Sequence, residues 1–567
     1  MNMMIVKFRI FAVAFLFFIA NAGVSQTVSF DFTDESIIER LTEDVSALAS
    51  DEMEGREAGT PGEEKAVNYI KERFLEMNLS PLFEETYFQY FDFPGEWMYA
   101  ENNTLQIDGN VYSCGEAFYP MVESGDASVT QKSVYLSYGY KNDTLHWNDY
   151  EGKEGLDGKI FVMEYYLPDS LYEMLEVSVN EAIYLRIQVA LEYGSGGILF
   201  VNSYKQENDP TISLRRRAHR SDIPIAFAGY DVFEYLEKKN FDVDVYLSVE
   251  LKREMYTGIN VAAYLDNGAS TTVVVGAHHD HLGYGGHTSR QTGGAPEVHY
   301  GADDNASGVA GVLETARYIS NHDWTGNNYL FITFSAEEKG LLGSRYFTES
   351  GVYDMDQINY MFNFDMIGRM QDNNLVLIGT GTSPLWENII TEHQPEDFNL
   401  RMAPSGIGGS DHTSFYLKDI PVIFFFTGIH DDYHKPGDTR EKINYEGQMQ
   451  ILHFAWEMMA TLDQSDRLAF TETPVDTSRR RRARGVTMGI MPDHAFDDKG
   501  LKVLRVIEGR PADEGGILDG DVIIALDELV VREIHSYMRA LQNYKSGDVV
   551  TITLLRDGEK MEVEIEF

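Results

Sequence analysis

The sequence predicts an α/β fold in which helices sandwich a mostly parallel mixed sheet, with an inserted α/β unit and a small β-rich unit attached. Two observations predict this architecture. Between residues 258 and 462, short apolar runs alternate with helical patterns, as in parallel sheets covered by helices on both faces. The length of 567 residues exceeds what one hydrophobic core organises, so several domains are expected.

Residues 1–22 have the features of an export signal. A short basic segment precedes an apolar run at residues 10–19, and Ala-Asn-Ala at 20–22 fits a signal-peptide cleavage site. The apolar run is too short for a comfortable membrane span. We therefore expect a secreted or periplasmic protein without stable membrane insertion.

The charge balance restricts the partners. Asp and Glu number 91 against 46 Lys and Arg, which gives a formal net charge of −45. Such a surface repels phosphate backbones, so no nucleic acid partner is expected. Cys114 is the only cysteine, so an intrachain disulfide is excluded.

The first elements follow from local patterns. Residues 36–79 predict two helices around a loop at 51–62. Residues 103–251 then predict a compact insert of short strands and a helix, without a cluster of metal-ligating side chains. Its expected strands span 159–166, 196–202 and 223–229, and its helix spans 179–193.

The alternating region supplies the main sheet. Its expected buried strands span 271–278, 328–335 and 421–428, and a helix is expected at 307–321. Residues 466–484 form a polar linker that ends in a basic run, and residues 485–567 form the small β-rich unit.

Histidines and carboxylates gather at the ends of the buried strands and in the loops between the elements. The clusters are GAHHDH at 276–281, GADDNASG at 301–308, SAEEKG at 335–340, NFDMIG at 363–368 and DDYHKPGDT at 431–439. Each alone is weak evidence, because strand histidines are usually core residues and acids before a helix usually cap it. Ligands of parallel sheets gather at the carboxyl ends of strands, so the five clusters indicate one site. Histidine nitrogen and carboxylate oxygen suit zinc.

The residues of these motifs, and their order along the chain, resemble those of the M28 family of metallopeptidases. The resemblance runs from residue 36 to residue 462 apart from the insert, and it includes the loop LASDEMEGREAGTPGE at 48–63. It implies a zinc exopeptidase fold built from residues 27–102 and 252–465, interrupted by the insert at 103–251. It also implies two Zn²⁺ ions as cofactors and peptides as substrates.

Matched position by position, the family implies five metal ligands. His278 would bind one zinc and Asp365 would complete that site. Glu338 and His434 would bind the other zinc, and Asp304 would bridge both.

Three further residues match the family's catalytic positions. Glu337 corresponds to the general base, which takes a proton from the attacking water and hands it to the leaving amine. Asp280 corresponds to the acid that orients the histidine ligand of the first zinc. Tyr433 corresponds to a tyrosine that hydrogen-bonds the oxyanion.

Some assignments stay open on the residues alone. His279 and His281 could form a ligand pair, although family spacing favours His278 with Asp280. Only the family pattern selects the second acid of the pair at 303–304 as the bridge. Asp411 is either structural or part of the pocket wall.

The two attached units carry resemblances of their own. In the insert, LDGKI at 156–160 and EYGSGGI at 192–198 resemble a protease-associated (PA) domain, which would restrict access to the active site. Its basic run at 215–220 is either an exposed loop or a contact with substrate or another domain. The motifs at 509–527 resemble a PDZ domain, whose loop at 488–491 could bind the C-terminal carboxylate of a peptide or simply pack.

The sequence therefore predicts a secreted zinc-dependent metallopeptidase that hydrolyses peptide bonds with metal-activated water, and we expect an aminopeptidase. The alternative enzyme is a carboxypeptidase of the same fold, in which Arg369 or Arg401 would hold the substrate carboxylate. Glutaminyl cyclases share the fold but lack the first histidine, which His278 supplies here. A catalytically dead scaffold is disfavoured because all five ligand positions are intact.

Overall fold

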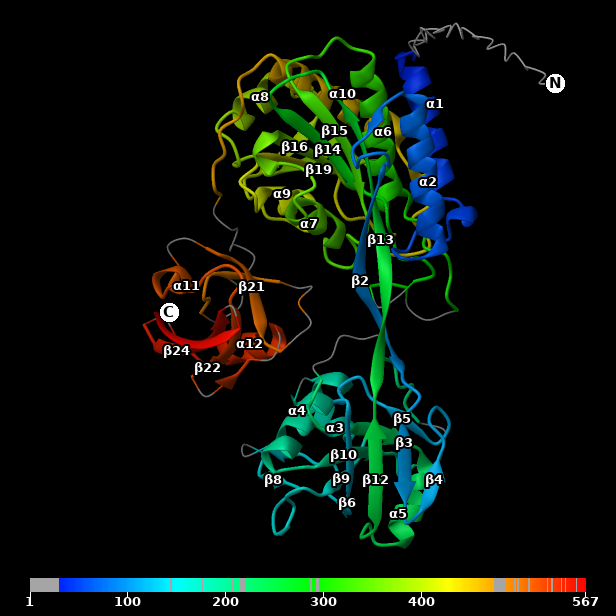
Figure 1. The fold of residues 1–567 in the computed structure, drawn as a ribbon, viewed down its shortest axis with the longest axis vertical. Coiled ribbons are helices and arrows are strands. Elements are labelled where there is room, and N and C mark those ends of the chain that lie inside the picture. The colour runs from blue at the N-terminus through cyan, green and yellow to red at the C-terminus, as the bar shows by residue number, and fades with distance from the viewer. Residues whose placement is uncertain are drawn as a thin grey trace, which may run out of the picture.

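The computed structural model describes the chain from residue 30 to residue 567, with short gaps. The gaps are 143–144, 176, 205–208, 215–219, 286–287, 292–294, 474–485, 494–495, 497–498, 508–509, 528, 532–533, 542, 546 and 557. The expected signal peptide, residues 474–484 of the linker and residues 215–219 of the basic run lie outside the described residues. The described part forms a large domain, an insert and a C-terminal unit (Figure 1).

The large domain is built on a nine-stranded sheet in the order β1-β13-β15-β14-β16-β19-β17-β18, with β2 paired to β13. The strands are β1 (Ser80–Pro81), β2 (Phe88–Tyr99), β13 (Leu251–Leu265), β14 (Thr272–His278), β15 (Asn328–Phe334), β16 (Ile358–Phe364), β17 (Asn374–Ile378), β18 (Asn399–Ala403) and β19 (Val422–Phe426). Strands β15, β14, β16 and β19 pair in parallel at its centre. Antiparallel pairs flank them, so the sheet is mixed, as expected.

Helices cover both faces of this sheet, because alternate residues of a strand point to opposite sides. Val273 and Val275 pack with helices α1, α2, α6, α8 and α10, whereas Val274 packs with α7 and α9. The helices are α1 (Asp34–Leu48), α2 (Pro61–Glu76), α6 (Gly308–Ser320), α7 (Leu342–Glu349), α8 (Trp386–His393), α9 (His412–Tyr416) and α10 (Tyr445–Asp463). Short helical segments are η1 (Asp51–Met53), η2 (Ala302–Ser307), η3 (Met355–Gln357) and η4 (Arg440–Lys442).

The insert has its own sheet and its own cores. Its eight strands follow the order β4-β3-β12-β6-β9-β10-β11-β5. Its elements are β3 (Thr104–Ile107), β4 (Asn110–Tyr112), β5 (Phe118–Pro120), β6 (Ala127–Tyr135), β7 (Lys141–Asn142), β8 (Trp147–Asn148), β9 (Ile160–Glu164), α3 (Asp169–Leu175), α4 (Val179–Glu192), β10 (Gly197–Val201), β11 (Ile225–Ala228), α5 (Tyr230–Lys238) and β12 (Asp244–Val249). The long antiparallel pair of β2 and β13 connects the insert to the large domain (Figure 1).

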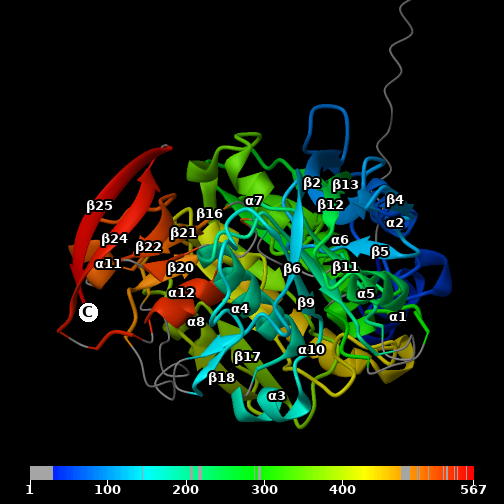
Figure 2. The same ribbon diagram turned by 90° about the horizontal axis from the view of Figure 1, so that it is seen from below.

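The C-terminal unit is a small sheet with two helices. It comprises β20 (Ile490–Pro492), β21 (Leu501–Val506), α11 (Pro511–Glu514), β22 (Val522–Leu526), β23 (Leu529–Val530), α12 (Ile534–Leu541), β24 (Val549–Arg556) and β25 (Glu559–Glu566). Seen from below, it lies to one side of the other two parts (Figure 2). Arg345 of α7 forms an ion pair of 2.7 Å with Asp493 of this unit. None of the described helices is long and apolar enough to cross a membrane.

Candidate metal centre

The candidate ligands lie at one edge of the sheet. His278 is the last residue of β14, Asp365 directly follows β16, and Glu338 lies in the turn after β15. Asp304 belongs to the η2 segment before α6, and His434 lies in the loop after β19. Because these strands are parallel and adjacent, their carboxyl ends bring the side chains together.

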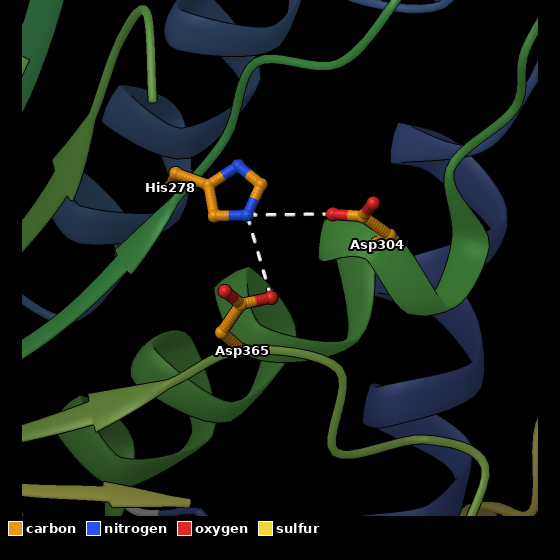
Figure 3. Close-up of side chains that lie close together, drawn as sticks. All are labelled: His278, Asp304 and Asp365. Atoms are coloured by element: carbon orange, nitrogen blue, oxygen red, sulfur yellow. Dashed lines mark ion pairs between the residues drawn. The ribbon is translucent and has the colours of Figure 1, made fainter. Parts of the chain in front are cut away.

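The first group consists of His278, Asp304 and Asp365 (Figure 3). The His278 Nε2 atom lies 3.4 Å from Asp304 Oδ1 and 3.4 Å from Asp365 Oδ1. All three residues are buried, and Asp365 Oδ1 has no hydrogen-bond partner among the described residues. A buried carboxylate oxygen without a donor needs a compensating cation, so this group fits a metal ion.

The second group surrounds the other oxygen of Asp304. His434 Nε2 lies 3.3 Å from Asp304 Oδ2 and 3.2 Å from Glu338 Oε2. His281 Nδ1 also approaches this group, at 2.9 Å from Glu338 Oε1 and 3.8 Å from Asp304 Oδ2. Asp304 therefore presents one oxygen to each group, the arrangement that a ligand shared by two metals requires.

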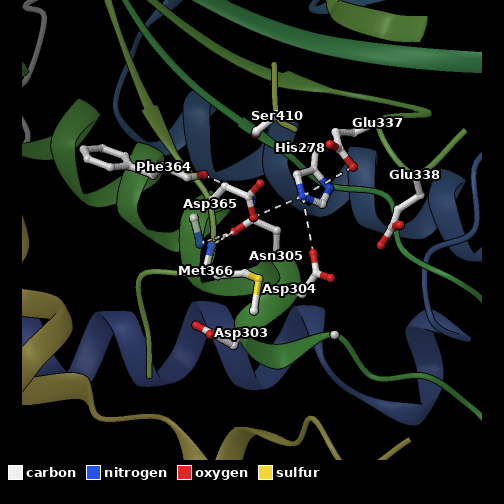
Figure 4. A network of polar contacts seen from close by, with 12 residues as sticks. His278, Asp303, Asp304, Asn305, Glu337, Glu338, Phe364, Asp365, Met366 and Ser410 are labelled. Atoms are coloured by element: carbon white, nitrogen blue, oxygen red, sulfur yellow. Dashed lines mark hydrogen bonds and ion pairs between the residues drawn. The ribbon is translucent and has the colours of Figure 1, made fainter. Parts of the chain in front are cut away.

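A neighbouring asparagine fixes the two aspartates relative to each other. Asn305 donates from Nδ2 to Phe364 O at 3.0 Å and accepts from Met366 N at 3.2 Å, so it holds both residues that flank Asp365 (Figure 4). The peptide bond between Asp304 and Asn305 is cis.

Charges within the site shift several pKa values. Burial alone would lower the pKa of His278, but the Glu337 and Asp365 carboxylates overcome it and raise the pKa well above its ordinary value. Burial would likewise raise the pKa of Asp304, yet hydrogen bonding to His278 and the charge of His281 hold it well below its usual range. Burial and Asp304 oppose ionisation of Glu338, and hydrogen bonds to His281 and His434 still lower its pKa to about 2. Cationic partners thus stabilise the ionised carboxylates.

Asp280 acts on its surroundings through two kinds of contact. Its main-chain carbonyl lies 3.1 Å from His278 Nδ1, whereas its Oδ1 atom lies 3.8 Å from the same nitrogen. The carboxylate accepts hydrogen bonds from the backbone N–H groups of Glu337 at 3.0 Å and Glu338 at 3.4 Å. Asp280 therefore sets the imidazole tautomer with its carbonyl and holds the glutamate turn with its side chain.

Glu337 and Tyr433 complete the set of expected catalytic residues. Glu337 Oε2 lies 4.0 Å from His278 Nε2. Burial raises the pKa of Glu337 well above its ordinary value; the charge of His278 opposes the shift, and Glu338 adds to it. Burial and the charge of Asp304 raise the pKa of Tyr433. The Tyr433 ring stacks on His434 with a centroid separation of 3.9 Å.

The remaining histidine and the two remaining acids of the open assignments belong to neither ligand group. His279 points away from both groups, with Nδ1 at 3.1 Å from Thr333 Oγ1 and Nε2 at 3.4 Å from Glu63 Oε1. Asp303 accepts from Gly368 N at 2.7 Å and so braces the loop after β16. Asp411 is buried, and this burial raises its pKa to about 6.

Sequence reasoning missed Arg56, which organises the backbone under the site. This fully buried guanidinium donates to the carbonyls of Leu48, His279, Tyr300 and Gly301. Burial lowers its pKa to about 10, against the charges of Asp304 and Asp438. The only signal was its place in the N-terminal loop motif at 48–63, which says nothing about its partners.

The two arginines of the carboxypeptidase alternative are placed differently from each other. Arg369 is ion-paired with Asp432 at 3.3 Å and lies 3.7 Å from Asp438. Arg401 is exposed on the edge strand β18. Arg369 is therefore neutralised within the protein.

Two family models match this chain. Residues 260–459 match the model of peptidase family M28, and residues 481–567 match the model of the PDZ domain. Leucine aminopeptidase 2 of Trichophyton equinum is 28% identical over 241 residues, which cover 36% of this chain and 44% of that protein. Aminopeptidase YwaD of Bacillus subtilis is 30% identical over 161 residues, which cover 26% of this chain and 35% of that protein. The chain thus spans less than half the length of these relatives.

Two solved aminopeptidase structures align with this chain. BSAP, a zinc aminopeptidase from Bacillus subtilis, aligns with a TM-score of 0.45 and 20% identity over 77% of this chain and 98% of that chain. The aminopeptidase from Aneurinibacillus sp. strain AM-1 aligns with a TM-score of 0.42 and 22% identity over 78% of this chain and 99% of that chain.

Proposed function

We propose, since this chain carries a peptidase domain of family M28, that it is a zinc-dependent aminopeptidase that releases N-terminal residues from peptides. One observation carries the proposal. Asp304 presents its two oxygens to two separate groups of buried histidine and carboxylate ligands. The aminopeptidase names of the similar proteins support the direction of cleavage.

The ligand groups fit two zinc ions. His278, Asp304 and Asp365 would hold one ion, and Asp304, Glu338 and His434 would hold the other. Histidine nitrogen with carboxylate oxygen is the donor set that zinc favours. Bound zinc polarises a carbonyl group and makes water more acidic.

The remaining steps fall to the protein's own side chains. Glu337 accepts the proton of the attacking water and passes it to the leaving amine. Asp280 keeps Glu337 in place through the backbone N–H. Tyr433, whose raised pKa keeps the phenol protonated, donates a hydrogen bond to the oxyanion.

The charged side chains around the candidate site are less consistent with a carboxypeptidase. Arg369, a candidate cation for the substrate carboxylate, is paired with Asp432. An aminopeptidase instead places the free amine of its substrate beside carboxylates, which Glu337 and Asp365 supply.

The attached parts have proposed roles as well. Residues 1–22 would direct export to the periplasm or medium, and the PA-like insert would limit access to the site. The PDZ domain would bind the C-terminus of a peptide through backbone N–H groups near Met488 and Gly489. Mass spectrometry of the exported protein would test the signal, because a retained residue 1 would contradict it.

The decisive experiment compares a peptide with a free amine and its N-acetylated copy, before and after chelation. Cleavage of the free peptide alone, abolished by a chelator and restored by zinc, is the expected result. Equal cleavage of both peptides, or release of the C-terminal residue, would reject the aminopeptidase direction. Activity that survives complete removal of metal would reject the zinc chemistry.

A further inference from the structure

We propose that Arg290 binds the C-terminal carboxylate of the substrate, so that the enzyme selects dipeptides and tripeptides. The inference rests on the proposed aminopeptidase function and adds a substrate class to it. It starts from one cation beside an acidic site in a chain of net charge −45.

The backbone of Arg290 is fixed to the metal centre. The Arg290 N–H donates to His434 O at 2.9 Å, and His434 Nδ1 lies 3.1 Å from Thr288 O. Ser289 Oγ lies 2.8 Å from His299 Nε2, which anchors the same segment on its other side. The position of residue 290 is therefore set by the loop that carries a proposed zinc ligand.

The side chain of Arg290 extends over the ring beside that ligand. Its guanidinium carbon lies 4.6 Å from the centroid of the Tyr433 ring. The Tyr433 ring in turn stacks on His434, whose Nε2 faces Asp304 and Glu338. Stacking on an aromatic ring orients an arginine while its donors stay available.

The charge of Arg290 is not neutralised within the described part of the chain. Three other cations around the site have carboxylate partners: Lys339 pairs with Glu57, and Arg369 and Lys442 pair with Asp432. The ammonium of Lys435 donates to Asp431 O at 2.8 Å. Arg290 is exposed and takes part in none of the ion pairs among the described residues. A planar guanidinium with free donors matches a carboxylate, which it binds through two parallel hydrogen bonds.

The distances select short peptides. The guanidinium carbon of Arg290 lies 4.6 Å from the centroid of the Tyr433 ring, and that centroid lies 3.9 Å from the centroid of the His434 imidazole. One extended residue spans about 3.3–3.6 Å. A carboxylate one or two residues beyond a bond cleaved at the metals can therefore reach Arg290, whereas the C-terminus of a longer peptide lies past it.

The test measures kcat and KM for leucyl-alanine and leucyl-alanine amide with the zinc-loaded full chain. Wild type is expected to prefer the free acid about tenfold through KM, the size of one charge-assisted contact at an exposed site. Arg290→Gln should remove this preference, and Arg290→Lys should keep part of it. Arg467→Gln is the matched control, because Arg467 is exposed and bonds Ile358 O at the opposite end of β16.

Two results would overturn the proposal. One is a wild-type enzyme that shows no preference for the free acid. The other is an Arg290→Gln enzyme in which kcat falls equally for both substrates, because Arg290 would then only position the His434 loop. Hydrolysis of N-acetyl-leucyl-alanine would instead reject the aminopeptidase direction while the acid preference stays measurable, so the two failures can be told apart.

Discussion

Glu337 differs from the neighbouring acids because it lies 4.0 Å from the candidate ligand His278 without belonging to either ligand group. Glu337→Gln keeps the shape of the side chain but cannot accept a proton. We expect kcat to fall about 10²–10⁴-fold with bound zinc unchanged. Steady-state kinetics and elemental analysis of the same sample would measure both.

The control for this substitution is Glu387→Gln, which changes an exposed glutamate of α8 in the same domain. It should keep wild-type kinetics. Loss of zinc together with activity in Glu337→Gln would assign Glu337 to the ligands and contradict its role as the base.

His281 and His434 compete for the role of second-site ligand. His434 has Nδ1 beside a carbonyl, which leaves Nε2 free to face Asp304 and Glu338. His281 instead uses Nδ1 in a 2.9 Å hydrogen bond with Glu338. We expect His434→Ala to lose about one of two zinc ions, and His281→Ala to keep both with affinity reduced about 10–100-fold. Equilibrium dialysis followed by metal analysis would measure this, and the reverse order would exchange the two roles.

The sequence located the candidate site because its side chains lie at the ends of buried strands or in the loops beyond them, and parallel pairing brings these strand ends to one edge of the sheet. It could not exclude His279 and His281 as a ligand pair without the family pattern, because local spacing does not show that His279 faces Thr333 and Glu63. It also missed that Asp280 holds the glutamate turn through backbone N–H groups. Such contacts join segments far apart in the chain and leave no mark in local spacing.

At the scale of elements, the loop between α1 and α2 is hydrogen-bonded to two of the segments that carry candidate metal ligands. Its Arg56 donates to four carbonyls, two of which belong to His279 and Gly301 beside candidate ligands. Arg56→Met would leave the carbonyls of Leu48, His279 and Tyr300 without this donor, at a cost of about 1–3 kcal/mol each before relaxation. Gly301 O would keep its hydrogen bond from Ala306 N. We expect a loss of roughly 3–5 kcal/mol in unfolding free energy and weaker zinc binding.

Denaturant unfolding of the metal-free and zinc-loaded protein would measure this effect. Arg467→Met is the control, because it removes one partly exposed hydrogen bond to Ile358 O and should cost under about 1 kcal/mol. Equal losses for the two variants would show that the carbonyls left without Arg56 find other donors.

Some helices and strands could be predicted from local sequence patterns and others could not, for physical reasons. The helix at 307–321 and the strand at 271–278 were strong patterns, and α6 and β14 occupy them. The arm formed by β2 and β13 was not predicted, because the first half of β13 is mostly exposed and mixes polar with apolar residues. Antiparallel edges of the sheet likewise depend on pairing between distant segments rather than on local composition.

At the scale of the whole molecule, three sets of hydrophobic cores divide the chain. The PDZ domain has a core of its own, and the large domain closes its fold before residue 474, where Thr473 bonds Gly406 and Tyr416. Ion pairs of Arg345 with Asp493, and of Arg505 with Asp419 and Glu472, link the two parts. A truncation after Thr473 should therefore keep the large domain folded, because no core is cut.

Calorimetry and kinetics of this truncated chain would test the division. We expect the unfolding transition of the PDZ domain to disappear while that of the zinc-loaded large domain shifts by no more than a few degrees, since each partly exposed ion pair between the two parts contributes about 1 kcal/mol or less. Hydrolysis of a short free-amine peptide should stay within about threefold of the full chain, because every candidate ligand precedes residue 435. A large loss of kcat with zinc retained would instead mean that the PDZ domain shapes the active site, and peptide capture and catalysis would then be one function rather than two.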